Sequence, residues 1–221
     1  MKQVLDQLKD GVRRFQREVY PKHEEAYRLV ANSKQAPHTL IVTCADSRID
    51  IETITSSLPG EIFVTRNVGN MVPAYGEMLG GVSAVIEYAV DALGVQHAVV
   101  CGHSDCGAMK CLLADPETLE TMPTVKSWLR NAAAALMVTK NISNADDSLQ
   151  TVLHSLTEQN VLLQLAHLKT HPSIAGGIAK GTLTVSGWVY DIEHGEVLIY
   201  DEGENRFLPV RGDTWSTEDE A

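Results

Sequence analysis

The spacing of apolar positions changes from one segment of the chain to the next, and each spacing predicts an element. Between residues 2 and 20 apolar side chains recur at helical intervals, at Val4, Leu5, Leu8, Val12, Phe15 and Val19. Such spacing places them along one side of a helix. The N-terminal segment is therefore predicted to be an amphipathic helix with a single apolar stripe.

Short apolar runs rich in β-branched residues predict the first strands. The runs span residues 39–44, 61–66 and 97–102. Nearly continuous apolar runs of this length are typical of parallel strands that are buried on both faces. Residues 80–93 lie between the second and third runs and are predicted to form a helix that Gly94 ends.

The second half of the chain begins with helical spacing, with interruptions, over residues 108–170. A short helix is predicted at 173–179, followed by strands at 182–190 and 196–200 that a hairpin around Glu193 to Gly195 joins. The alternation of strands and helices predicts an α/β fold. Its sheet is mainly parallel and flanked by helices, with an N-terminal helical arm and C-terminal strands.

Length and composition fit one domain and exclude several classes of partner. The 221 residues are 44 % hydrophobic, which allows a sizeable core. We expect one domain over residues 1–221, with a helical arm at 1–30 and a mobile acidic tail at 212–221. A net charge of -11 without a basic stripe argues against nucleic acid and anionic membranes. No apolar run could span a bilayer and no export signal is evident, so we expect a cytoplasmic protein.

Polar clusters follow two of the predicted strands where each strand ends. The first reads Cys44-Ala45-Asp46-Ser47-Arg48, and the second reads Gly102-His103-Ser104-Asp105-Cys106-Gly107. Sites in open α/β sheets form beyond the carboxyl ends of the strands, so the two clusters converge if their strands are neighbours. Two thiolates and an imidazole suit zinc, and three protein ligands leave the fourth position open, as in catalytic sites.

The same residues also have plainer interpretations. The chain has four cysteines, and Cys101 and Cys111 are interpreted as packing residues rather than as ligands or half-cystines. Asp46 and Arg48 could form a structural ion pair. Asp105 is expected to cap a helix or to face solvent.

The two clusters resemble the paired signature of the β-class carbonic anhydrases, in CADSR at 44–48 and GHSDCGA at 102–108. The resemblance includes FVTRNVGNMVP at 63–73, GGVSAVIEYAV at 80–90 and GWVYDIEHGEV at 187–197, and it extends to about Val210. It is greatest to the bacterial enzymes encoded with cyanase and to the plant-type branch.

The resemblance implies reversible hydration of CO2 to bicarbonate and a proton through zinc-bound hydroxide. It implies one Zn2+ per chain with Cys44, His103 and Cys106 as ligands, and a dyad of Asp46 and Arg48 beside the open position. It further implies a substrate pocket, in part across a subunit interface, formed by Gln35, Phe63, Val68 and Tyr88. The implied assembly is a homodimer, paired as a dimer of dimers.

Two further expectations follow from the resemblance. A hydrolase of carbon disulfide or carbonyl sulfide on the same fold is the main alternative, because it would share the metal ligands. One branch of the family marks an inhibitory bicarbonate pocket with a tryptophan three residues before the first zinc cysteine. Ile41 stands there in this chain, and Thr43 stands where that branch has glycine. We therefore expect no cooperative inhibition by bicarbonate and a formed Asp46–Arg48 pair.

Overall fold

Six strands form one sheet in the computed structural model, which describes residues 2–77 and 80–210. The strand order is β2-β1-β3-β4-β5-β6, with bounds β1 Thr39–Cys44, β2 Ile62–Asn67, β3 His97–His103, β4 Thr184–Asp191, β5 Glu196–Asp201 and β6 Arg206–Pro209. Strands β2, β1, β3 and β4 are parallel, and β5 and β6 are antiparallel to their neighbours. This confirms the predicted mainly parallel α/β fold with C-terminal strands. The acidic tail predicted at 212–221 lies outside the described residues.

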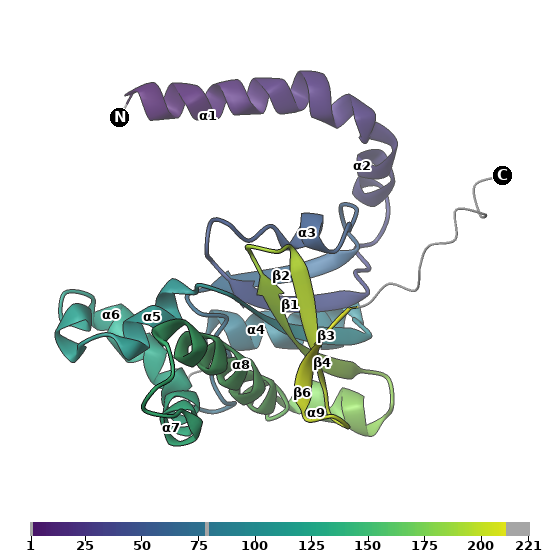
Figure 1. The fold of residues 1–221 in the computed structure, drawn as a ribbon. Coiled ribbons are helices and arrows are strands. Elements are labelled where there is room, and N and C mark those ends of the chain that lie inside the picture. The colour runs from purple at the N-terminus through teal and green to yellow at the C-terminus, as the bar shows by residue number, and fades with distance from the viewer. Residues whose placement is uncertain (1, 78–79, 211–221) are drawn as a thin grey trace, which may run out of the picture.

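The helices occupy both sides of the sheet and a projecting arm (Figure 1). The α-helices are α1 Lys2–Arg14, α2 Glu24–Ala31, α3 Ile51–Ile54, α4 Gly81–Glu87, α5 Gly107–Leu113, α6 Pro123–Trp128, α7 Ala133–Ile142, α8 Leu149–Leu168 and α9 Pro172–Ala179. Shorter π- and 3-10-helical turns are η1 Phe15–Val19, η2 Tyr20–Lys22, η3 Tyr88–Leu93, η4 Pro116–Leu119 and η5 Leu129–Ala132. The helix predicted at 80–93 is α4 continued by η3, and Gly94 ends it with a φ of 73°.

The two faces of the sheet bury different sets of side chains. Leu40 and Val42 of β1 belong to a large core under α4, α8 and α9, whereas Ile41 belongs to a smaller cluster with Ile51 of α3. Successive side chains of a strand point to opposite faces, so one strand contributes to both clusters. A third cluster lies beneath α5 to α8 and includes Cys44 and Cys106.

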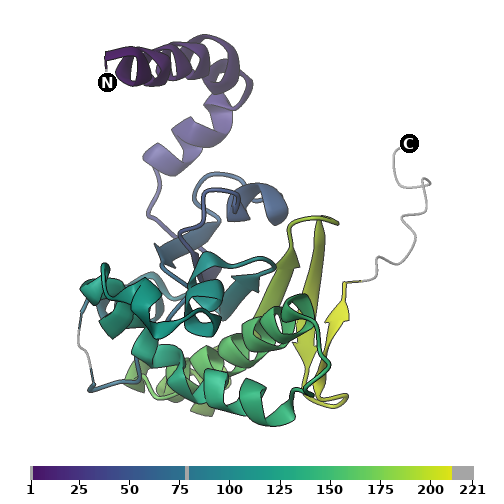
Figure 2. The same cartoon turned by 60° about the vertical axis from the view of Figure 1, so that its left-hand side comes forward.

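Helix α8 packs very closely against β3 and β4, as the two views of the ribbon show (Figures 1 and 2). Glycines at the contact make this approach possible. A Cβ atom on Gly102 would lie 2.7 Å from Cγ2 of Val161, and one on Gly187 would lie 2.8 Å from Cγ1 of the same side chain. Both distances are too short for real Cβ contacts, so the branched Val161 fills the space left by two absent side chains.

The N-terminal helices project from the sheet as an arm (Figures 1 and 2). The predicted apolar stripe is present on it, and its side chains are between 39 % and 65 % exposed: Val4, Leu5, Leu8, Val12, Phe15 and Val19. At the bend of the arm the Tyr20 and Tyr27 rings stack with centroids 5.3 Å apart. The arm is thus an amphipathic element whose apolar side has no cover within the described chain.

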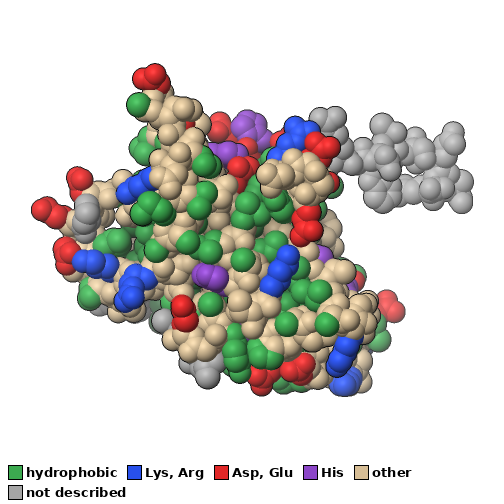
Figure 3. Space-filling view, turned by 90° about the horizontal axis from the view of Figure 1, so that it is seen from below, with side chains coloured by type: hydrophobic (Ala, Val, Ile, Leu, Met, Phe, Trp, Pro, Cys, Tyr) green, Lys and Arg blue, Asp and Glu red, His purple; other side chains and the backbone are tan. Residues whose placement is uncertain are grey.

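On the face shown in Figure 3, basic side chains lie in small separate groups among acidic ones. Within residues 2–77 and 80–210, no helix combines the length and the apolar character that crossing a membrane requires.

Candidate metal centre and active site

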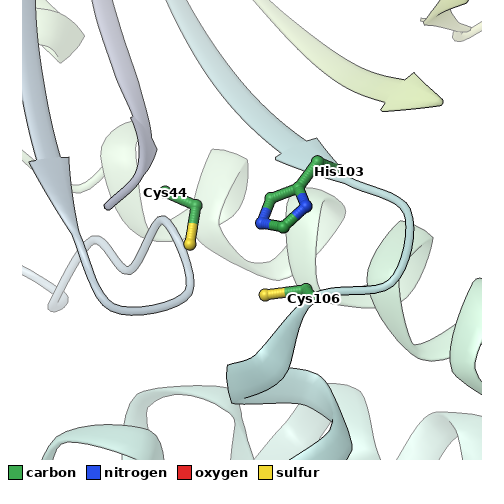
Figure 4. Close-up of side chains that lie close together, drawn as sticks. All are labelled: Cys44, His103 and Cys106. Carbon is green, nitrogen blue, oxygen red and sulfur yellow. The ribbon is translucent and has the colours of Figure 1, made fainter. Parts of the chain in front are cut away.

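Cys44, His103 and Cys106 converge at the carboxyl edge of the parallel strands. Cys44 ends β1, and His103 ends the adjacent strand β3. Cys106 follows three residues later at the start of α5. One ligand atom from each of the three lies within 4.8 Å of the others, and Figure 4 shows the side chains directed toward a common space. The predicted convergence is confirmed.

The His103 ring is oriented to offer a lone pair to this space. Its Nδ1 lies 2.8 Å from the carbonyl oxygen of Ser104, which can only accept, so Nδ1 carries the proton. Its Nε2 is buried and has no hydrogen-bond partner among the described residues. Buried polar atoms rarely lack a partner, and metal-binding histidines commonly hydrogen-bond through their other nitrogen. The ring therefore fits a metal ligand.

The two thiols are buried, with exposures of 6 % for Cys44 and 1 % for Cys106. A hydrogen bond from the Cys106 thiol lowers the pKa of Cys44, and His103 and the backbone N–H of Gly69 act in the same direction. The pKa of Cys106 is raised because it lies beside that thiolate and is buried. A doubly charged, borderline-soft cation would allow both sulfurs to ionise, so two thiolates and an imidazole fit zinc.

Asp46 and Arg48 form the predicted pair beside this group. Arg48 Nε donates to Asp46 Oδ1 at 2.9 Å, and Nη2 donates to Oδ2 at 2.7 Å. The Arg48 guanidinium holds the pKa of Asp46 well below its usual range, so the carboxylate is ionised near neutral pH. Asp46 Oδ2 is 3.9 Å from His103 Nε2, which places this charge at the metal centre.

The expectation for Asp105 is confirmed in part, because its side chain is half-exposed to solvent but does not cap α5. Cys106 stands at the N-cap of α5. The Asp105 side chain is 41 % exposed, and it accepts a hydrogen bond from Arg48 Nη1 at 2.9 Å and pairs with Lys110. No local pattern indicates this contact, since Arg48 and Asp105 are 57 residues apart.

Helix α8 supports the loop that follows β2, a role that the sequence did not indicate. Asn160 donates to the carbonyl of Gly69 at 3.1 Å, and Gln164 accepts from the N–H of Val72 at 2.8 Å. The Gln164 amide also donates to Asn160 Oδ1 at 2.9 Å. Asn160 and Gln164 are four residues apart, so they share one side of the helix. Polar residues at helical spacing within an apolar helix are the signal that could have identified them.

The predicted pocket residues are only partly brought to the metal centre. Val68 directly follows Asn67, which pairs with Cys44, so Val68 lies beside the site. Phe63 lies four residues before Asn67 on β2, about 13 Å away along the strand at ~3.3 Å per residue. The Tyr88 ring is 6.1 Å from the Phe63 ring, and Gln35 lines a separate hollow near His38. Within one chain these three residues are not in contact with the metal ligands.

The remaining cysteines are packing residues, as predicted. Cys101 is fully buried in β3, and burial raises its pKa to about 12. Cys111 is half-buried against the cluster beneath α5 to α8.

A mainly parallel sheet whose carboxyl edge presents two cysteines and one histidine defines a metalloenzyme with an open coordination position. Residues 39–197 match the family model described as carbonic anhydrase. A carbonic anhydrase of Pseudomonas aeruginosa is 45 % identical over 201 residues, covering 91 % of this chain and 90 % of that one.

Solved structures show the same similarity. The β-carbonic anhydrase CcaA superposes with a TM-score of 0.89 at 34 % identity, over 96 % of this chain and 94 % of that one. A structure from a study of two tetrameric β-carbonic anhydrases of Sordaria macrospora gives a TM-score of 0.80 at 27 % identity, over 89 % and 96 %. The chain belongs to the β-class carbonic anhydrase family. Its cofactor is zinc, and Cys44, His103 and Cys106 are positioned to bind one ion.

Proposed function

We propose that this chain catalyses the reversible hydration of CO2 to bicarbonate and a proton. The observation that carries the proposal is the ionised Asp46 carboxylate beside the convergent Cys44, His103 and Cys106. Zinc, when bound by these three residues, supplies the Lewis acidity that makes hydroxide available near neutral pH.

Asp46 and Arg48 are the proposed catalytic residues. Asp46 is ionised and can only accept hydrogen bonds, so it would accept one from the attacking water and orient that water. Arg48 occupies both carboxylate oxygens in a fork, which fixes the direction of the remaining lone pairs. The pair thus supplies a directed acceptor at the centre.

We infer that the substrate pocket is completed by a second copy of the chain. Val68 lies beside the metal centre, whereas Gln35, Phe63 and Tyr88 lie toward the opposite ends of the strands. Strand β2 stands at one end of the described sheet, and the arm exposes its apolar stripe, so both offer surface to a partner. A similar structure comes from a study of tetrameric enzymes. We propose a homodimer, paired into a dimer of dimers, in the cytoplasm.

The alternative, hydrolysis of carbon disulfide or carbonyl sulfide, would use the same metal ligands. The relatives reported above are carbonic anhydrases, and this favours CO2 as the substrate. Measuring CO2 hydration by stopped flow beside CS2 hydrolysis, on one preparation of known zinc content, distinguishes the two. Hydrolysis of CS2 without hydration of CO2 would refute the proposal.

Substitution of each metal ligand tests the site itself. Cys44→Ser, His103→Ala and Cys106→Ser should each lower zinc content and abolish CO2 hydration, because each removes one of three protein ligands. Cys111→Ser is the matched control, since this half-buried thiol lies outside the group. A ligand variant that keeps full zinc and full activity would remove that residue from the ligand set.

A further inference from the structure

Arg48 is held from two directions by two aspartates. Asp46 accepts hydrogen bonds from Nε and from one N–H of Nη2 of Arg48, as described above. The Oδ2 atom of Asp105 accepts a hydrogen bond from Nη1 at 2.9 Å, and the backbone carbonyl of Asp105 accepts one from Nη2 at 3.2 Å. Four of the five N–H groups that a guanidinium carries are thereby engaged. The side chain is nevertheless 44 % exposed, so this order comes from its partners rather than from burial.

Asp105 is itself fixed in place. It lies between the two metal ligands His103 and Cys106, in a left-handed backbone conformation with a φ of 59°. Its other carboxylate oxygen pairs with Lys110 on α5. A half-exposed ion pair between two free side chains contributes little, because both must lose rotamer freedom. Here the carboxylate belongs to a chain of three charged partners, in which Lys110 pairs with one oxygen and Arg48 with the other.

We infer that Asp105 is a positioning residue: it holds Arg48 in the orientation that keeps the Asp46 carboxylate at the metal centre. The inference rests on the proposed function, because it assigns Asp46 a part in CO2 hydration. Asp46 alone contacts only one side of the guanidinium. Without Asp105 the Nη1 side of Arg48 would face solvent, and the guanidinium could swing with the carboxylate that it holds.

Asp105→Asn tests this with little disturbance, because asparagine is similar in size and tolerates the left-handed conformation. Replacing the carboxylate weakens its charge-assisted contacts with both Arg48 and Lys110, which should lower kcat about tenfold and leave KM within about twofold. Zinc content should stay at one per chain. Asp146→Asn, which removes the same charge from an exposed turn, is the matched control and should not change kcat.

A double-substitution cycle with Arg48→Ala separates positioning from a general structural role. If Asp105 acts through Arg48, then Asp105→Asn should change kcat by less than about twofold once Arg48 is absent. An equal loss of kcat in both backgrounds would overturn the inference. So would a single Asp105→Asn variant with the kcat of the unsubstituted enzyme.

A crystal structure of Asp105→Asn provides a readout that does not depend on activity. Displacement of the Arg48 guanidinium from Asp46 supports the inference, and an unmoved Asp46–Arg48 pair overturns it. If the unsubstituted protein carries zinc but hydrates no CO2, the proposed function fails, and this structure still decides whether Asp105 positions Arg48.

Discussion

Two arginines organise the loop that carries Cys44, and they do so with different partners. Arg48 binds two side-chain carboxylates and one backbone carbonyl, whereas Arg66 donates only to backbone carbonyls among the described residues. Arg66 Nε reaches the carbonyl of Cys44 at 3.1 Å, and Nη2 reaches those of Asp46 at 2.9 Å and Ile49 at 2.5 Å. Arg66 is therefore a clamp for the loop backbone.

The guanidinium of Arg66 is engaged by three backbone carbonyls, and this supports the expectation that bicarbonate does not inhibit cooperatively. Ile41 is buried against Ile51, and the Thr43 hydroxyl donates to the carbonyl of Cys101. By the resemblance, Ile41 and Thr43 stand where the other branch has its tryptophan and glycine, and both side chains are engaged in the core. We predict hyperbolic inhibition in initial-rate measurements over a range of bicarbonate concentrations. Steeply sigmoidal inhibition, or a crystal structure at neutral pH with Asp46 bound to zinc, would contradict this.

The ionisation of the dyad constrains the pH dependence. The pKa of Asp46 is lowered by Arg48, and that of Arg48 is raised by Asp46 and Asp105, so neither group changes charge near neutral pH. A rise of activity with pH must then come from the attacking water. Two thiolate ligands would cancel the formal charge of a bound zinc ion, so this water would be less acidic than at an all-imidazole site.

We predict that kcat/KM rises from neutral toward alkaline pH. Stopped-flow assays with zinc content measured at each pH would establish the profile, because loss of metal in acid could mimic it. A profile that is already flat at and below neutrality would contradict the charge argument. Asp105→Asn should not change the direction of this dependence.

At the residue scale the sequence predicted the metal ligands but not their supports. The three ligands Cys44, His103 and Cys106 could be identified from the sequence because they belong to two short motifs at strand ends. The contacts of Asp105 with Arg48 and of Asn160 with Gly69 join residues 57 and 91 positions apart. They depend on how a turn and a helix pack against the loop, which local patterns do not encode. The catalytic and substrate-binding roles of Asp46, Arg48, Gln35, Phe63, Val68 and Tyr88 stay predictions.

Element boundaries were predicted best where burial is continuous. The first three strands begin and end within about one residue of the expected positions, because apolar β-branched runs end sharply at polar residues. Strand β6 was missed, since only Phe207 among its four residues is buried. The expected N-terminal helix is α1 extended by the π-helical turn η1. The chain then bends at η2, where Pro21 occupies an early helical position.

Helix α8 combines core packing with a polar row that supports the metal centre. Asn160 is 1 % exposed, and its side-chain amide donates a hydrogen bond to the backbone carbonyl of Gly69. The backbone N–H of Gly69 in turn lowers the pKa of Cys44. We predict that Asn160→Ala lowers the free energy of unfolding by about 1–3 kcal/mol, because it leaves a buried carbonyl without its partner. It should also weaken zinc retention.

Urea denaturation of zinc-loaded protein and a chelator competition measure the two effects. Gln159→Ala is the control, since this amide is the neighbouring residue on the same helix and is only half-buried. An Asn160→Ala variant that is as stable as the control and retains zinc equally well would show that α8 supports the sheet alone.

At the scale of the whole molecule, the exposed apolar stripe of the N-terminal arm predicts that the chain forms an oligomer. Apolar side chains along α1 are exposed in the single chain, and burying them against another copy would be favourable. We predict that Leu8→Glu combined with Val12→Glu reduces the oligomer observed by light scattering and lowers activity. Gln7→Glu with Lys9→Glu alters charge on the same helix outside the stripe and serves as the control. An active monomer would contradict this prediction.

The overall fold could be predicted because strand and helix patterns alternate along the chain. The position of the arm could not, because an amphipathic pattern specifies an apolar side but not the surface that covers it. For the same reason, the sequence placed Gln35, Phe63 and Tyr88 in one pocket with the metal only through resemblance. The division into one domain over residues 1–221, with an arm at 1–30, stays a prediction.

The close contact of α8 with the sheet also restricts how this sequence can diverge. Gly102 and Gly187 lie on neighbouring strands, and the methyl groups of Val161 occupy the space where a side chain at either position would lie. A larger residue at either glycine would collide with that valine unless position 161 became smaller first. Evolutionary change at these three positions is therefore coupled, and in an alignment of relatives they should vary together or not at all.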